Sequence, residues 1–249
     1  MKSTEKSGQL MKKSGTNVIY TILLLTVSVF AALLLYLHFF APGDEDLSGE
    51  WTANLDMSGR AAITALDWLQ DIEGVSVSLE TLKPYMQDLT IQVNLTMKQT
   101  AGSGGTFQCE ISPESYDACN QAAYEAFAAA FQELLTERLH MAGYTGDTDE
   151  EALEALVTET FGMSTVSYLM TCGPKLLPSL EDLQAEYDSS GTYEVTENTL
   201  TRQFEDGQPV DTRTEYYIHK DTTMVLSKEA DSAASGFFSD DYPMVFTLK

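Results

Sequence analysis

The ten residues Leu89-Thr-Ile-Gln-Val-Asn-Leu-Thr-Met-Lys98 alternate apolar and polar side chains without a break. Because successive side chains of a β-strand point to opposite faces, this pattern predicts a strand with one apolar and one polar face. Ala101 to Gly105 then forms a glycine-rich turn, and Phe107-Gln-Cys-Glu-Ile111 resumes the alternation. The two segments therefore predict a β-hairpin with Cys109 on its apolar face.

The same period of two recurs on both sides of this hairpin. Gly49 to Met57 alternates with Trp51 on its apolar face, and after Gly191 the alternation returns in short segments joined by turns. An up-and-down antiparallel barrel is the simplest arrangement of such strands, because it leaves no sheet edge unpaired. The eight predicted strands lie near residues 50–57, 89–98, 106–111, 192–196, 199–205, 212–219, 223–228 and 243–249.

Between the third and fourth predicted strands the period becomes that of an α-helix. Ser112 and Pro113 are typical of a helix N-terminus, and an apolar stripe follows them. Thr148-Asp-Glu-Glu151 is a capping-box pattern that predicts a second helix continuing toward Met170. The fold class is therefore α+β, an eight-stranded antiparallel barrel with a helical insertion at 112–190. The predicted helices lie near residues 61–72, 78–86, 112–143, 148–170 and 180–187.

Val18 to Phe40 runs 23 residues without a charged side chain. At about 1.5 Å of helical rise per residue, this segment is long enough to cross the roughly 30 Å core of a bilayer. Four lysines and one acid precede it, so the N-terminus is expected in the cytoplasm. A cleaved signal peptide is the alternative, but its apolar region usually has only about 7 to 15 residues. We expect a cytoplasmic tail (1–17), a transmembrane helix (18–41), a linker (42–48) and an extracellular domain (49–249) that contains the barrel and the helical insertion.

The predicted extracytoplasmic part is strongly acidic. Residues 42–249 carry 10 of the 14 Lys and Arg residues and 37 of the 38 Asp and Glu residues, a net charge of −27. Phosphates of nucleic acid and of anionic lipids would be repelled by such a field. We therefore expect no nucleic-acid partner. The acids are dispersed along the chain, which favours a solvated acidic surface over a cation-binding run.

The residue types that usually carry catalysis are few. Cys109, Cys119 and Cys172 cannot all pair and lack CxxC spacing, and we favour free thiols on apolar faces over a Cys109–Cys119 disulfide. His140 and His219 are the only histidines outside the predicted anchor, and both are expected at the surface. No P-loop, GxGxxG, HExxH, GxSxG or SxxK motif is present. We therefore expect no enzyme activity, no cofactor and no metal.

Two short motifs indicate a family. Gly49-Glu-Trp51 on the first predicted strand resembles the GxW motif of the lipocalin and calycin group. Tyr193-Glu-Val195, which follows Gly191 and precedes two hairpins, resembles bacterial lipocalin-like domains of unknown function that follow a single membrane anchor. The resemblance covers the strand segments and implies that Trp51 packs across the barrel floor under a basic residue, for which Lys249 is the only candidate. The helical insertion departs from ordinary lipocalins.

The leading hypothesis is a non-enzymatic, single-pass membrane protein whose extracytoplasmic barrel binds a small apolar ligand. The apolar strand faces either fill the barrel or line a cavity, and the sequence leaves both alternatives open. A second hypothesis is an interaction module that docks an envelope protein through residues 112–190. A third, an envelope hydrolase, has no motif behind it. The predicted ligand-facing residues are Trp51, Leu55, Met57, Ile91, Val93, Met97, Phe107, Val195, Phe204, Met224, Leu226 and Phe246.

Overall fold

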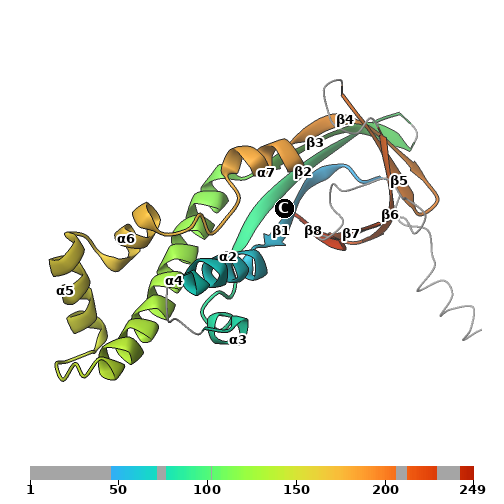
Figure 1. Ribbon diagram of the computed structural model, residues 1–249. Coiled ribbons are helices and arrows are strands. Elements are labelled where there is room, and N and C mark those ends of the chain that lie inside the picture. Colours follow the sequence, from blue (N-terminus) through green and yellow to red (C-terminus); the bar gives the residue numbers. More distant parts are fainter. Residues whose placement is uncertain (1–45, 72–76, 102, 206–211, 229–241) are drawn as a thin grey trace, which may run out of the picture. The chain divides into compact units, whose positions relative to one another are not determined.

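The computed structural model describes residues 46–71, 77–101, 103–205, 212–228 and 242–249 (Figure 1). These residues belong to one compact unit, Asp44–Lys249. The predicted cytoplasmic tail, the transmembrane helix and most of the linker lie outside the described residues. In the part of the chain that is described, no helix is both long and apolar enough to span a membrane.

Eight antiparallel strands form a closed barrel in which each strand pairs with its neighbours in the chain and β8 returns to β1 (Figure 1). The predicted eight-stranded antiparallel barrel is therefore confirmed. The strand bounds are β1 Gly49–Asp56, β2 Thr90–Ala101, β3 Gly104–Ile111, β4 Ser189–Thr196, β5 Thr199–Phe204, β6 Thr212–Lys220, β7 Thr223–Lys228 and β8 Met244–Leu248.

The alternating pattern of β2 determines the register of the strands around it. Leu95 of β2 lies opposite both Trp51 of β1 and Cys109 of β3, and all three side chains are buried. A slip of one residue would turn the apolar face of β2 toward solvent, so burial of that face selects this register. The outward residues, such as Asn94, keep the polar side of the pattern.

The seam between β1 and β8 is paired over only part of its length. Trp51 pairs with Leu248 and Thr52 with Thr247, whereas β1 pairs with β2 from Gly49 to Asp56. Beyond Thr52, β1 remains paired with β2 and β8 remains paired with β7, but β1 and β8 do not pair with each other. Asn54 and Val245, which would be opposite partners in a continued ladder, are unpaired across the seam. The two strands are therefore not hydrogen-bonded to each other along one half of this seam, which we call the open half.

Four of the six described helices, α4 to α7, lie between β3 and β4 in the chain, which is where the sequence predicts a helical insertion. The long helix α4 packs against β2 and against α5 and α6, and α7 packs against β3 (Figure 1). The edge of the Trp68 ring on α2 meets Phe127 of α4 with 5.8 Å between ring centroids. The helix bounds are α2 Ser58–Gln70, α3 Leu79–Leu82, α4 Pro113–Met141, α5 Glu150–Phe161, α6 Thr165–Cys172 and α7 Leu180–Tyr187.

The helix ends show where local sequence signals were right and where they were wrong. Ser112 caps α4 as predicted, since its hydroxyl oxygen accepts a hydrogen bond from the Ser115 amide at 3.2 Å. The cap of α5 is Asp149 and not Thr148, because the Asp149 carboxylate accepts from the Ala152 amide. The predicted single helix from 148 to 170 is two helices, because the chain turns at Gly162 in a left-handed conformation.

Trp51 is buried near the start of β1 and contacts Leu47, which is also buried. Its indole Nε1 donates to the Leu47 carbonyl oxygen at 2.9 Å, and its ring meets the edge of His219 with 5.3 Å between centroids. Lys249 does not occupy the position that the resemblance implied. Its Nζ donates instead to Oδ1 of Asn94 on the outer face of the barrel. The surface position expected for His219 was also wrong, because this residue is half-buried against Trp51.

Candidate functional site

The twelve predicted ligand-facing residues lie in or at the edge of a packed core. Eleven are at most 4% exposed, and Phe204 is half-buried. Met57 lies beyond the end of β1, at the N-cap of α2. A void large enough for a ligand would leave accessible surface on the side chains that line it, yet Ile91, Val93 and Met224 have none. At these positions the barrel is filled and not hollow.

The interior also holds three charged side chains and a tyrosine. We call these four residues the ionic cluster: Arg202, Arg213, Glu215 and Tyr242. Arg202 of β5 and Glu215 of β6 form a bidentate ion pair, with Nε to Oε2 at 2.8 Å and Nη2 to Oε1 at 2.6 Å. Both side chains are buried. Tyr242 lies two residues before the start of β8, and its hydroxyl donates a hydrogen bond to the same carboxylate. This contact joins the start of β8 to β6 across the intervening β7.

Two arginines lie opposite each other inside the barrel, at Arg202 of β5 and Arg213 of β6. The Arg202 guanidinium lies over the ring of Phe107 at 5.4 Å and over that of Phe204 at 5.6 Å, and Arg213 also lies over Phe204 at 5.6 Å. Cation–π contacts of this kind are strongest where water is excluded. With two cations and the one carboxylate of Glu215, the cluster has one positive charge in excess.

Burial and neighbouring charges act in opposite directions on the pKa values of the cluster. Burial alone would lower the pKa of Arg202, but the Glu215 carboxylate outweighs it and raises that pKa. Burial and the charge of Arg202 lower the pKa of Arg213. Burial, and then the Glu215 charge, raise the pKa of Tyr242. At neutral pH the Tyr242 phenol is therefore a neutral hydrogen-bond donor to the carboxylate.

The ionic cluster was missed at the level of sequence although its signal was present. Leu200, Arg202 and Phe204 occupy alternate positions of one strand, so Arg202 shares the inward face of two apolar residues. Glu215 shares its face with Tyr217 in the same way. Charged residues on such a face are normally taken as breaks in the pattern, because an unpaired buried charge is costly. Only the pairing of β5 with β6 shows that Arg202 and Glu215 are partners.

A groove lies along the open half of the β1–β8 seam, and we call it the seam groove. It has a volume of about 890 Å³ and extends from Thr52 and Thr247, the last paired residues, to Tyr242 and α2. Its apolar walls include Leu55 of β1 and Met244 and Val245 of β8. Because Tyr242 lines this groove and also belongs to the ionic cluster, the groove adjoins the charged interior of the barrel.

A second groove, the α2 groove, continues from the first along α2. It has a volume of about 510 Å³ and lies between α2 and the segment 175–179, where Leu176 and Leu177 are buried beneath its floor. Arg60 and Ile63 of α2 line both grooves. The side chain of Ile63 is 51% exposed, so it contributes apolar surface where the two grooves meet.

Only three of the twelve predicted residues line any described groove. Leu55 lines the seam groove, whereas Phe107 and Phe204 line a more polar depression of about 400 Å³ on β2 to β5, together with Lys98 and Glu205. The groove residues Ile63 and Val245 were not predicted. Ile63 sits in a helix whose burial depends on the whole fold, and Val245 points outward from β8. No pattern in the sequence indicates that Ile63 and Val245 line the same groove.

The three cysteines are free, as favoured from the sequence. Cys109 and Cys119 are buried, and burial raises the pKa of the Cys109 thiol to about 12 and that of Cys119 to about 11. Cys172 at the end of α6 is exposed, so its expected burial was wrong. Within the residues that the structure describes, no group of His, Cys, Asp or Glu side chains could hold a metal ion.

Comparisons with protein-family models, curated proteins and solved structures found no match.

Proposed function

We propose that the protein is a non-enzymatic, membrane-tethered module whose lipocalin-like barrel binds a small apolar ligand in the seam groove. The anchor in this proposal is the apolar segment Val18–Phe40, and the barrel lies outside the cell. The observation that carries the proposal is the open half of the β1–β8 seam. There, apolar residues of two strands and of α2 face a groove of about 890 Å³, within the size range of small-molecule sites.

The filled interior supports a site in the wall of the barrel. A ligand inside would have to displace well-packed side chains such as Ile91 and Met224, and large voids in such cores are costly. A ligand in the seam groove displaces no core residue. It covers the exposed side chains of Ile63 and Val245, beside Asn54 and Val245, which are unpaired across the seam.

The proposal is tested with purified residues 42–249 by native mass spectrometry and by thermal shift with a panel of long-chain alcohols, acids and hydrocarbons. We expect a co-purified apolar ligand or a rise in melting temperature with at least one class. Ile63→Asn should reduce the shift, whereas Ile218→Asn should not, since Ile218 is even more exposed than Ile63 but lies on the outer face of β6. No bound ligand and no shift with any class would reject the function.

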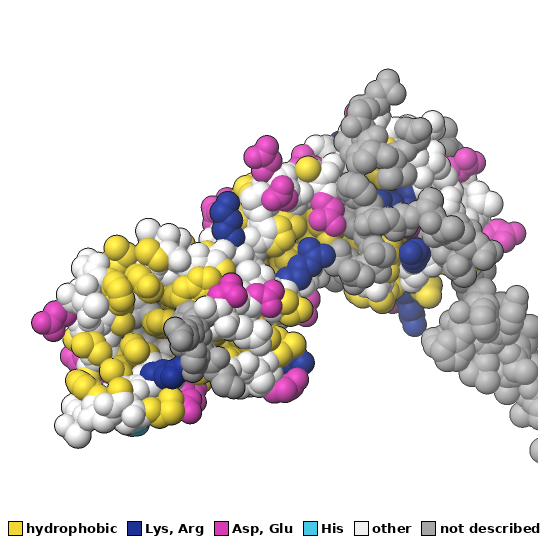
Figure 2. Space-filling view, in the orientation of Figure 1, with side chains coloured by type: hydrophobic (Ala, Val, Ile, Leu, Met, Phe, Trp, Pro, Cys, Tyr) yellow, Lys and Arg dark blue, Asp and Glu magenta, His cyan; other side chains and the backbone are white. Residues whose placement is uncertain are grey.

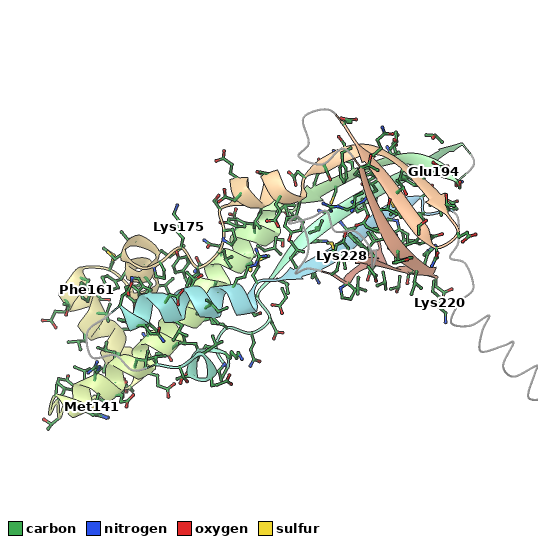
Figure 3. The ribbon with its side chains drawn as sticks, turned by 45° about the vertical axis from the view of Figure 1, so that its right-hand side comes forward. Met141, Phe161, Lys175, Glu194, Lys220 and Lys228 are labelled. Carbon is green, nitrogen blue, oxygen red and sulfur yellow. The ribbon has the colours of Figure 1, made fainter. Side chains whose placement is uncertain are left out.

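A second candidate function rests on the described surface of α4 to α6. Phe161 of α5 stacks on Tyr168 of α6 with 4.3 Å between ring centroids, and Met141 and Met170 are also exposed. Figure 2 shows apolar side chains gathered over these helices, and Figure 3 labels Met141 and Phe161 there. Exposed apolar patches of this kind support docking of an envelope protein. Crosslinking in membranes tests it: loss of one discrete adduct in Phe161→Ser supports docking, and an unchanged pattern rejects it.

A further inference from the structure

The outer face of β5 to β8 differs in charge from the outer face of β1 to β4. Among the described residues, the outward positions of β5 to β8 hold threonine, serine, glutamine, tyrosine, isoleucine, valine and lysine, and none holds Asp or Glu. The outward positions of β1 to β4 include the exposed acids Glu50, Glu110 and Glu194. Figure 3 labels Glu194 on one side of the barrel and Lys220 on the other. We call the outward side of β5 to β8 the acid-free face.

Apolar side chains lie in register on the acid-free face. Ile218 of β6 is opposite Val225 of β7, and Val225 is opposite Val245 of β8. Directly opposite side chains on one face of a sheet lie about 4.5–5.5 Å apart, so these three form a continuous row across three strands. Ile218 is 64% exposed, Val245 52% and Tyr216, two positions from Ile218 on β6, 36%. Single exposed apolar residues are ordinary, whereas a contiguous group of them marks a contact surface.

The charge of the acid-free face indicates which partner fits it. A cationic partner meets no carboxylate on these strands, and an acidic partner meets only Lys220 and Lys228, each the last residue of its strand. Residues 42–249 carry a net charge of −27, so two copies that approach through other surfaces bring carboxylates against carboxylates. Like charges placed against each other exclude a contact. Through the acid-free face two copies can meet without such a conflict.

The area of the face predicts a weak contact. Four strands about 4.8 Å apart and about 22 Å long present roughly 900 Å² when two copies meet, which is below the roughly 1,200 Å² of stable complexes. A weak contact is sufficient for copies that are held in one membrane by the proposed anchor Val18–Phe40. A tether makes the encounter nearly intramolecular and raises the effective concentration, to about the mM range for short flexible linkers.

We infer that two copies of the chain associate side by side in the membrane through their acid-free faces, as an isologous dimer whose two-fold axis passes near Ile218 and Val225. In such a dimer a residue close to the axis lies beside its own counterpart. This inference goes beyond the ligand of the seam groove. Val245, at the end of the apolar row, also lines that groove, whereas Ile218 and Val225 do not.

The test is cysteine crosslinking of the full chain in phosphatidylcholine liposomes. Cys109 and Cys119 are buried, so a Cys172→Ser background leaves no exposed thiol among the described residues. Ile218→Cys and Val225→Cys are introduced singly, and disulfide-linked dimers are measured after oxidation with copper phenanthroline. The matched control is Thr192→Cys, an exposed position on the outer face of β4. We expect both test positions to crosslink about tenfold faster than the control, because their thiols are held together by the contact.

A charge variant tests the reason for the contact. In the Val225→Cys chain, Ile218→Glu places a carboxylate of each copy against the other and should slow crosslinking by about tenfold. Thr192→Glu adds the same charge on β4 and should change the rate by less than about twofold. Because Ile218 is 64% exposed, its variant should keep the melting temperature of the parent chain. Raising the salt from about 0.02 to 0.3 M should speed crosslinking, since it screens the repulsion between two copies.

Three results would overturn the inference. Equal rates at Val225→Cys and Thr192→Cys would show that copies meet only by random collision. An Ile218→Glu chain that crosslinks as fast as its parent would show that the face is not the interface. A rate that falls with added salt would indicate a contact between opposite charges. None of these results bears on ligand binding in the seam groove, which Ile63→Asn tests separately.

Discussion

Glu215 is the residue on which the charged interior depends. Its carboxylate accepts two hydrogen bonds from Arg202 and one from Tyr242, and it is 1% exposed. Removing one partner of a buried ion pair leaves the other charge uncompensated, at a cost of about 3–5 kcal/mol. We expect Glu215→Gln to lower the free energy of unfolding by about this amount in urea denaturation, because the buried Arg202 then loses the carboxylate that compensates its charge.

The matched control is Glu194→Gln, which neutralises an exposed carboxylate on the outer face of β4 (Figure 3). A change within about 0.5 kcal/mol is expected there, as for most surface substitutions. Equal losses in the two variants would show that Glu215 does not hold the cluster together.

The cysteines should differ sharply in reactivity. The thiolate is the reactive species, and Cys109 and Cys119 are buried with raised pKa values, whereas Cys172 is exposed. At pH 8 and without denaturant, we expect one thiol to react rapidly with Ellman's reagent and two to react only after unfolding. Cys172→Ser should remove the rapid phase. A rapid phase of three thiols would contradict the packing of β3 and α4 against β2.

Burial of Cys109 also predicts a pH dependence of stability. Its folded pKa of about 12 lies above the ordinary value of 9.0, so the folded protein keeps a proton that the unfolded chain releases. The contribution is fully present below pH 9 and is lost as pH rises toward 12, at up to about 1.4 kcal/mol per pH unit. Cys109→Ala should show a shallower decline than wild type in urea denaturation between pH 9 and 11. Parallel declines would mean that the thiol is solvated.

Individual residues show what the sequence could supply. The sequence predicted inward apolar residues on every strand except β6, because the period of two is local, and eleven of the twelve residues that it named are at most 4% exposed. The roles of Arg202 and Glu215 were not, because their partnership depends on β5 lying beside β6. The cover of Trp51 was also missed: it is His219, from a strand that lies far from Trp51 in sequence.

Among the elements, β4 and β5 approach so closely that a side chain does not fit between them at Gly191. A Cβ atom there would lie 2.0 Å from the Gln203 carbonyl oxygen of β5. We expect Gly191→Ala to destabilise the fold by about 1–3 kcal/mol, as overpacked sites do. Thermal and urea unfolding of the variant measure this loss.

Gly59 in the first turn of α2 provides the control, because a Cβ atom there would have no neighbour within 4 Å. Gly59→Ala should therefore stabilise by about 0.4–1 kcal/mol through the unfolded chain. If Gly191→Ala were neutral, the close approach of β4 to β5 would be incorrect.

Elements with strong local signals were predicted well. The eight strands, the N-terminus of α4 and the helix Leu180–Tyr187 agree with the structure within a few residues. The division of α5 from α6 was missed, although Gly162 is a stop signal and Ser164, two positions later, is a start signal. The apolar stripe continues across Gly162, and that continuity was given more weight than the glycine.

The whole molecule is where prediction from the sequence reached its limit. Closure of the barrel follows from counting strands, but the extent of closure does not. Whether β1 and β8 pair over two residues or over their full length depends on α2 and on the Tyr242–Glu215 contact, and both act across the fold. The seam groove is a product of that partial closure. A site that arises because β1 and β8 do not pair leaves no motif in the sequence of either strand.

The most direct measurement is a methyl NMR titration of residues 42–249, labelled on isoleucine, leucine, valine and methionine methyl groups, with dodecanoic acid. Our account places the ligand in the wall of the barrel, so the methyl signals of Ile63, Met244 and Val245 should shift, whereas those of Val93, Met224 and Leu226 in the filled interior should stay in place. Shifts concentrated on the interior methyl groups, with Ile63 and Val245 unchanged, would contradict it.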